Sequence, residues 1–391
     1  MDNQAPPFTW VRDRATLRAL VEALAAAPWL ALDSESNSMF VYRERVCLLQ
    51  LNVGGALWLV DPIALAPGDD PQERARALEP LAAPLADPRL RIWIHGGEYD
   101  VACLKRDFDI ALAGLFDTQQ AASFLGWPRT GYATVVQELC GVSLSKAKRD
   151  HDWGRRPIDD EALRYALDDV LHLPTIGETL VRRIADADIE EELALANLGV
   201  AATEAHDNRF DPSKMWRLDG VAELDRERLA LLTALYAWRD QKGRELDRPP
   251  GRLIANEPLM QLARKAPRDA PSLGRVRLRR SFVVSHGEEL LALIDRALRE
   301  PPGIPPKPRK PKRAPAERAR HRALQAWRRE EADRRQLPQQ VVLPKQALDW
   351  LAREGADDLV ACPQLGPGRI GRYGSILQRL CPRNSEVRES Q

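Results

Sequence analysis

The chain has 391 residues, of which 44% are hydrophobic and 29% are charged, so it can bury more than one core and is long enough for two or three domains. It contains no apolar run of the roughly 18 to 20 residues that a membrane span needs, and its start lacks the basic and apolar segments of a secretory signal. We therefore expect a soluble, cytoplasmic protein. The five cysteines are scattered and form no Cys-x-x-Cys pair, which argues against a disulfide framework and a zinc site.

Charge is divided unevenly along the chain, although the net charge is only +1. Residues 1–200 hold 20 Lys or Arg and 31 Asp or Glu, a net charge of −11, and the remaining residues carry +12. The basic excess gathers in residues 264–280 and in the Pro-rich stretch 307–335. Such stretches favour a nucleic acid as partner, because Lys and Arg neutralise its phosphates and the counterions released from the phosphate backbone make binding favourable. Alternatively, they form a semi-rigid linker and a solvated helix face.

Apolar periodicity predicts alternating helices and strands in the first part of the chain. We expect a long helix around 159–183, and helical modules after about residue 205. This order favours a mixed sheet that is flanked by helices. In chain order, the elements expected before that helix are a helix over 14–26, strands over 28–33, 46–53 and 57–61 with a turn at Gly54-Gly55, a helix over 72–85, a strand over 90–95, a helix over 99–106 and a strand over 113–117.

Acidic residues stand where two of these strands end. Asp33 and Glu35 close the first apolar strand, and as residues i and i+2 they face the same side. The strand over 90–95 runs through Gly96-Gly97 into a helix, and Asp100 lies near the positive end of that helix. Each motif alone has a plainer interpretation, namely a polar strand end or an acid that stabilises a helix start.

A third acidic motif lies on the predicted helix around residue 165. Tyr165 and Asp169 are i and i+4 and share a helix face, whereas Asp168 is rotated away by about 100°. An exposed acidic helix face is the alternative interpretation. Taken together, the acids offer oxygen ligands, which suit magnesium or manganese.

These three motifs, in this order, resemble the DEDD-type 3′→5′ exonucleases of the tyrosine subclass. Phe116-Asp117-Thr118-Gln119 and Asp152-Trp153-Gly154-Arg155-Arg156-Pro157 narrow the resemblance to the ribonuclease D family. Leu231-Leu232, Trp238-Arg239 and Arg248-Pro249-Pro250 are similar to the helicase-and-ribonuclease-D C-terminal (HRDC) module, and a fainter second copy includes Trp327-Arg328 and Tyr373-Gly374.

The resemblance implies an α/β fold: a ribonuclease-H-like mixed-sheet exonuclease domain with one antiparallel strand, followed by all-helical HRDC modules. We place the exonuclease domain at residues 1–205 and the first HRDC module at 206–300. A Pro/Lys-rich linker at 301–315 and a second, degenerate HRDC-like module at 316–391 complete the chain. The resemblance also favours a monomer.

The resemblance assigns catalysis to Asp33, Glu35, Asp100, Tyr165 and Asp169. We expect the four acids to hold two divalent cations, Mg²⁺ or Mn²⁺, about 3.5 to 4 Å apart, and Tyr165 to orient the attacking water. One cation would make hydroxide available and the other would stabilise the leaving 3′ oxygen, so no protein nucleophile is needed.

Substrate contacts and substrate identity also follow from the resemblance. Lys146, Lys148, Trp153 and Arg156 match a stretch for which the resemblance implies contacts with RNA phosphates or the terminal base. Solvated surface cations and a packed Trp153 are the alternatives. Ser36-Asn37-Ser38 departs from the family pattern where a wedge usually parts the terminal bases, and Met39, Phe40 or Tyr42 could take over that task. The expected reaction trims the 3′ ends of structured RNAs, notably transfer RNA precursors, and releases nucleoside 5′-monophosphates. A 3′→5′ DNA exonuclease of the same superfamily and a non-catalytic RNA-binding protein remain as alternatives.

Overall fold

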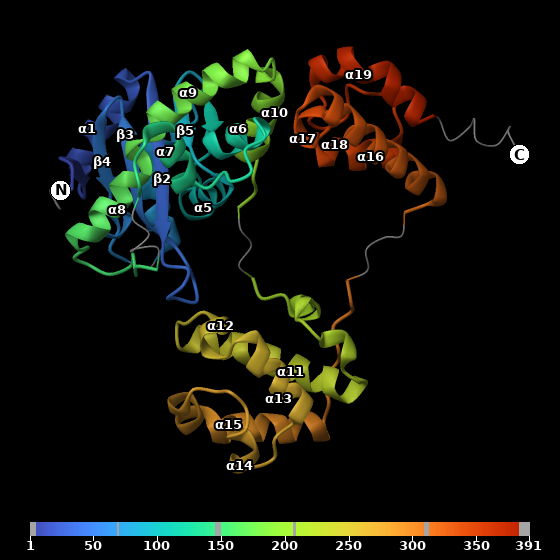
Figure 1. Ribbon diagram of the computed structural model, residues 1–391. Helices are drawn as coiled ribbons and strands as arrows, with labels where there is room; N and C mark the ends of the chain where they lie inside the picture. Colours follow the sequence, from blue (N-terminus) through green and yellow to red (C-terminus); the bar gives the residue numbers. More distant parts are fainter. Residues whose placement is uncertain (1–4, 69, 145–149, 206–208, 309–312, 383–391) are drawn as a thin grey trace, which may run out of the picture. The chain divides into compact units, whose positions relative to one another are not determined.

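A mixed six-stranded sheet forms the centre of the N-terminal part of the protein (Figure 1). The computed structural model describes residues 5–382 apart from 69, 145–149, 206–208 and 309–312. The strand order is β1-β4-β3-β2-β5-β6, and β3 runs antiparallel to both of its neighbours while the other pairs are parallel. The expected mixed sheet with one antiparallel strand is therefore confirmed for the described residues. The strands are β1 (Thr9–Val11), β2 (Trp29–Ser36), β3 (Val46–Val53), β4 (Ala56–Val60), β5 (Arg91–Ile94) and β6 (Leu115–Asp117).

The antiparallel strand β3 is buried along its whole length. Its near-continuous apolar sequence fits a central strand that is covered on both faces. A tight turn joins it to β4, and Gly54 and Gly55 adopt φ values of 57° and 103° there. Glycine reaches these values without steric cost, which explains why this turn could be predicted from the sequence.

Helices cover both faces of the sheet, and β2 separates the two cores. Leu30 and Leu32 point into the core under α1 (Arg14–Ala26), α3 (Pro71–Leu78) and α5 (Glu98–Phe108), whereas Ala31 points into the opposite core. Since side chains alternate along a strand, Asp33 and Glu35 face the same side as Ala31. That side is covered by α6 (Thr118–Phe124), α7 (Tyr132–Cys140), α8 (Asp160–Leu171) and α9 (Leu173–Asp186), of which α8 and α9 cross in front of the strands in Figure 1.

Two predicted helices are interrupted. The helix expected around 159–183 is wrong in its continuity, because α8 ends at Leu171 and α9 begins at Leu173. Pro174 lacks the N–H that a continuous helix would donate to the carbonyl of residue 170, and its ring would crowd that carbonyl. The helix expected over 72–85 breaks for the same reason at Pro80. It divides into α3, η1 (Glu79–Leu81) and α4 (Ala82–Leu85).

Residues 37–45 and, among the described residues, 209–308 form a second compact unit, and the part after residue 209 is helical, as expected. Its core includes Met215, Leu235, Leu262 and Ile294. The Tyr42 hydroxyl donates a hydrogen bond to Asp240 at 2.9 Å within this unit, so Tyr42 has a protein partner. The elements are η2 (Pro212–Arg217), η3 (Val221–Glu223), α11 (Arg226–Glu245), α12 (Pro250–Leu253), α13 (Asn256–Lys265), α14 (Ala270–Leu273) and α15 (Arg280–Arg299).

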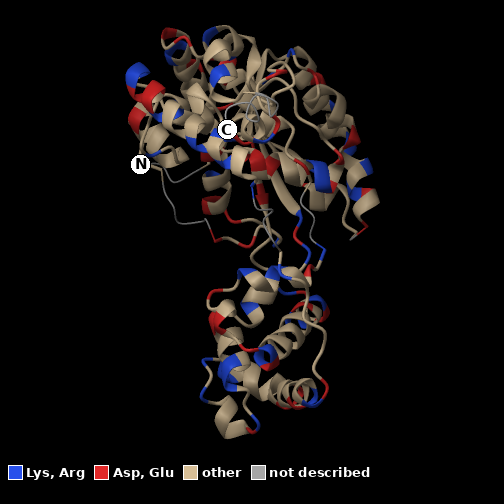
Figure 2. Ribbon diagram, turned by 90° about the vertical axis from the view of Figure 1, so that its right-hand side faces the viewer, with Lys and Arg blue, Asp and Glu red and all other residues tan. Residues whose placement is uncertain are grey.

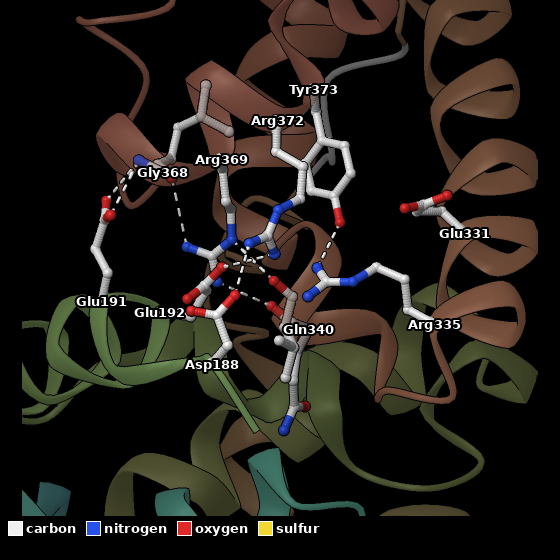
Figure 3. Close-up of polar contacts among 12 residues, drawn as sticks. Asp188, Glu191, Glu192, Glu331, Arg335, Gln340, Gly368, Arg369, Arg372 and Tyr373 are labelled. Carbon is white, nitrogen blue, oxygen red and sulfur yellow. Dashed lines mark hydrogen bonds and ion pairs between the residues drawn. The ribbon is translucent and has the colours of Figure 1, made fainter. Parts of the chain in front are cut away.

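The C-terminal helices belong to the same compact unit as the sheet. One of them, α19 (Gly366–Leu380), packs on α10 (Glu190–Ala201), and Figure 3 shows polar contacts between α19 and residues 188–192. The Gly368 N–H lies 3.0 Å from both carboxylate oxygens of Glu191, and Arg372 pairs with Asp188 at 3.2 Å. These helices are α16 (Pro315–Arg335), α17 (Gln339–Val342), α18 (Lys345–Glu354) and α19 (Gly366–Leu380). In the described part of the chain, no helix combines the length and apolarity of a membrane span.

Candidate active site

Three of the predicted acids converge at one point beside the sheet. Asp33 and Glu35 come from β2, and Asp169 comes from α8, which packs against β2 and β3. One carboxylate oxygen of each residue lies within 4.8 Å of one from both of the others. All three side chains are half-buried. The i, i+2 spacing on β2 delivers two carboxylates, and the helix on that face delivers the third.

Asp100 joins this group from the neighbouring strand-to-helix connection. It lies in the first turn of α5, directly after β5, which pairs in parallel with β2. Its side chain is only 6% exposed, and the hydroxyl of Ser34 donates a hydrogen bond to one of its carboxylate oxygens. Nothing in the sequence pattern singled out Ser34, which lies between Asp33 and Glu35 and faces the opposite side of the strand.

Burial and mutual repulsion raise the pKa values of these acids. Burial raises the pKa of Asp33 well above its ordinary value, and the charges of Asp100, Asp169 and Glu35 raise it further. Burial and the charges of Asp169 and Asp100 have the same effect on the pKa of Glu35. Burial raises the pKa of Asp100 to about 6, against the hydrogen bond from Ser34. Burial and the charges of Asp168 and Asp100 raise the pKa of Asp169 to about 7.

This donor set fits a divalent cation. Several carboxylate oxygens face one another across a short distance, and a hard cation with oxygen ligands is the group that stabilises their charged forms. Bound cations reverse the local pKa balance, because they favour the ionised carboxylates that burial disfavours. Asp33, Glu35 and Asp169 therefore form a cluster of carboxylates that could hold a metal ion.

Tyr165 lies on α8 one turn before Asp169. Its ring packs against Trp153, with ring centroids 6.3 Å apart and planes inclined by 34°. Trp153 is only 1% exposed and also contacts His151 edge-on. The tryptophan therefore supports the tyrosine from inside the core, which limits the positions that the tyrosine ring can take.

A second tyrosine near the acids was not anticipated. Tyr132 begins α7, and its hydroxyl donates a hydrogen bond to the backbone carbonyl of Asp168 at 2.9 Å. Burial raises the pKa of Tyr132 well above its ordinary value, and the charges of Asp169 and Asp33 add to this effect. Tyr132 also packs edge-on against His95, whose pKa burial lowers to about 4. His95 is therefore neutral at pH 7, which agrees with a structural role.

The residues that we expect to contact the substrate differ in their exposure and in their protein partners. Trp153 is buried, and Arg156 is engaged by a bidentate pair with Asp61, at 2.8 and 2.7 Å, and by the Cys47 carbonyl. Because its donors have protein acceptors, this geometry favours a structural role for Arg156. Met39 is 39% exposed and Phe40 is half-buried, both in the 37–45 segment of the second unit. Lys146 and Lys148 lie outside the described residues.

Comparison with known proteins identifies the family. A model of 3′-5′ exonuclease domains matches residues 8–185, and a model of the HRDC domain matches residues 228–294 and 317–381. Ribonuclease D of Gluconacetobacter diazotrophicus is 31% identical over 350 residues, which are 88% of this chain and 86% of that protein. Ribonuclease D of Acidiphilium cryptum is 31% identical over 384 residues, 96% and 93% of the two chains. The chain belongs to the ribonuclease D family.

Structure comparison agrees with membership in the ribonuclease D family. Escherichia coli RNase D, described as an exoribonuclease involved in structured RNA processing, superimposes with a TM-score of 0.66 at 26% identity, covering 96% of this chain and 98% of that one. The chain is thus a nuclease with a 3′→5′ exoribonuclease domain and a helical HRDC region, and it is suited to binding nucleic acid. The HRDC match at residues 317–381 confirms the fainter second copy. The domain limits that we expect from the sequence stay predictions.

Proposed function

We propose that the protein hydrolyses RNA from the 3′ end by two-metal catalysis and releases nucleoside 5′-monophosphates. The observation that carries this proposal is the convergence of Asp33, Glu35 and Asp169 within 4.8 Å, with buried Asp100 beside them. These four acids hold the cations, and Mg²⁺ or Mn²⁺ is the expected ion because all the ligands are oxygens. The proposal includes a monomer that acts in the cytoplasm.

When bound, two such cations supply a hydroxide nucleophile at neutral pH and stabilise the leaving 3′ oxygen. The chain's own residues position the ligands and the water. The Ser34 hydroxyl donates a hydrogen bond to one oxygen of Asp100 and so helps to orient its carboxylate. Tyr165 orients the attacking water, and Trp153 holds the tyrosine ring from the core side.

Structured RNA, such as the 3′ end of a transfer RNA precursor, is the substrate that we propose. The first HRDC module supports this choice through its basic residues, and Lys and Arg positions are prominent on the helices of the second unit in Figure 2. Residues 264–280 hold seven Lys or Arg and one Asp, and Arg277, Arg279 and Arg280 are exposed. The 20-residue helix α15 begins there without an acidic residue in its first turn. This face can attract RNA phosphates by charge and by counterion release.

The test is the release of mononucleotides from matched single-stranded RNA and DNA with 3′ extensions, in magnesium, manganese or chelator. Asp33→Ala removes a ligand, and Asp160→Asn serves as the matched control because Asp160 is an exposed acid at the start of α8. We expect stepwise, metal-dependent trimming of RNA by the wild type and the control, and near-complete loss in Asp33→Ala. Equal trimming of DNA would favour a DNA exonuclease of the same superfamily. Tight RNA binding without cleavage would contradict the proposal.

A further inference from the structure

A buried carboxylate outside the acidic cluster joins two backbone segments beside the active site. Asp117 is the last residue of β6 and is fully buried. Its carboxylate accepts four backbone hydrogen bonds. Two come from Gly96 and Gly97 at 2.9 and 3.0 Å, and two come from Gln119 and Gln120 at 2.8 and 3.2 Å.

Only half of these bonds are explained by helix capping. Asp117 is the N-cap of α6, and an N-cap aspartate normally accepts the N–H groups of the first helical turn, here those of Gln119 and Gln120. The bonds from Gly96 and Gly97 come from a different element, the turn between β5 and α5. A buried carboxylate that receives several N–H groups is a strong and directional tie. Asp117 therefore joins the ends of two neighbouring parallel strands.

Neighbouring contacts tighten the same connection. The Thr118 hydroxyl donates a hydrogen bond to the Ile94 carbonyl at 2.9 Å, and the backbone N–H of Asp117 donates to the side-chain oxygen of buried Asn197 at 3.2 Å. The turn itself tolerates no side chains. Gly96 has φ +69°, and a Cβ on Gly97 would lie 2.4 Å from the Ile94 side chain.

The turn that Asp117 holds leads directly to Asp100. Helix α5 begins at Glu98, only one residue after Gly97, and Asp100 lies in its first turn. A shift of the turn would therefore move the Asp100 carboxylate relative to Asp33, which sits on the adjacent strand β2.

We infer that Asp117 is a positioning residue for the metal site: it fixes the backbone from which Asp100 reaches the cations. This inference rests on the proposed function, because it assumes that Asp100 is a ligand. Groups that orient metal ligands from outside the coordination shell typically change metal affinity by about 10- to 100-fold when they are replaced. Asp117 would act in the same way through the backbone.

Asp117→Asn tests the inference, because the amide nitrogen cannot accept a hydrogen bond, so at least one of the four N–H groups loses its acceptor. We expect Mn²⁺ binding, measured directly by calorimetry or paramagnetic resonance, to weaken by about 10- to 100-fold. The Mg²⁺ concentration for half-maximal cleavage should rise by the same factor, while the KM for RNA at saturating metal stays unchanged. Excess metal should restore part of kcat.

Asp107→Asn is the matched control. Like Asp117, Asp107 is a buried acid that accepts a backbone N–H, from Val46 at 2.7 Å, but it lies at the end of α5 that is far from Asp100. This variant should lose stability and keep the wild-type affinity for Mn²⁺. The inference is overturned if Asp117→Asn loses stability to a similar extent and also binds Mn²⁺ as tightly as the wild type.

Thr118→Val provides a second test if Asp117→Asn does not fold. It removes the hydroxyl that bonds to the Ile94 carbonyl and keeps the size of the side chain. We expect a weakening of Mn²⁺ binding by several-fold, and unchanged binding in this variant would also overturn the inference. Wild-type protein that fails to bind Mn²⁺ at all would instead refute the proposed function, and the inference would fall with it.

Discussion

Replacing one of the site acids should stabilise the metal-free protein. Asp169→Asn keeps the shape of the side chain and removes a charge that burial and the neighbouring acids disfavour. The pKa of Asp169 is raised from 3.8 to about 7 in the folded protein, so the folded state keeps a proton that the unfolded state loses. Between these two values the folded state binds more protons, and the stability of the wild type falls as pH rises.

The size of this effect follows from the shift. A shift of about 3 units corresponds to about 4 kcal/mol at a pH above both values, and to almost nothing below pH 4. This is an upper figure, because Asp169 shares its repulsion with the other acids. For a unit of this size, 4 kcal/mol raises the melting temperature by roughly 10 °C. The Asp169→Asn variant has no carboxyl group at this position to lose a proton, so its stability should not fall in this way as the pH rises.

The assay is thermal unfolding of chelator-treated protein between pH 5 and 8, followed by tryptophan fluorescence. Asp169→Asn should melt above the wild type at pH 8, and the gap should narrow towards pH 5. Asp160→Asn, which changes an exposed acid of the same helix, should show no such pH-dependent gap. Added Mn²⁺ should stabilise the wild type at pH 8 and leave Asp169→Asn nearly unchanged. A lower melting temperature for Asp169→Asn at pH 8, or a gap that does not depend on pH, would refute the reasoning.

Three further predictions follow from the site and its surroundings. Tyr165→Phe should lower kcat by roughly 10² to 10⁴ and keep Mn²⁺ affinity, because it removes the hydroxyl that orients the water and none of the metal ligands; kinetics and metal titration check this. Arg156→Gln should destabilise the protein by about 2 kcal/mol in denaturant unfolding, since buried Asp61 loses its bidentate partner and keeps only Arg12, at 3.6 Å, as an ion pair, without changing the salt dependence of KM. Replacing the exposed residues Arg277, Arg279 and Arg280 together with Gln should instead weaken that salt dependence. The slope of log KM against log salt concentration should fall by about two to three units, because each phosphate contact contributes about one unit.

Part of the site could be predicted because it depends on residues that lie close together in the sequence. Asp33 and Glu35 share a face through the two-residue period of a strand, and Tyr165 and Asp169 share one through the helical period. The apolar run before each strand end marked where the sheet would finish. The interruption at His172 could also have been predicted, since Pro174 is visible in the sequence and cannot continue a helix.

Other features depend on contacts between distant residues. Ser34 bonds to Asp100 across 66 positions of the chain, and Asp117 bonds to Gly96 across 21 positions. No local period indicates either contact. Strand β1 has only three residues, Thr9–Val11, which is too short for a reliable alternation, and it is defined by its parallel pairing with β4. Sequence reasoning therefore indicated the acids that converge and missed Ser34 and Asp117, which bond to their surroundings.

The charge of the groups that surround the acids bears on metal binding. In the part of the chain that the structure describes, burial, the neighbouring acids and, for Asp33, a backbone N–H set the pKa values of Asp33, Glu35 and Asp169, with no contribution from Lys or Arg. A basic side chain at this point would relieve the repulsion and would also compete with a cation for the same oxygens. The neutral hydroxyl of Ser34 donates a hydrogen bond to Asp100, and we infer that the backbone hydrogen bonds to Asp117 hold the turn before Asp100, so neither contact brings a positive charge to the site. The negative charge therefore stays available for the cations that we propose, and we expect the metal-free fold to be less stable for that reason.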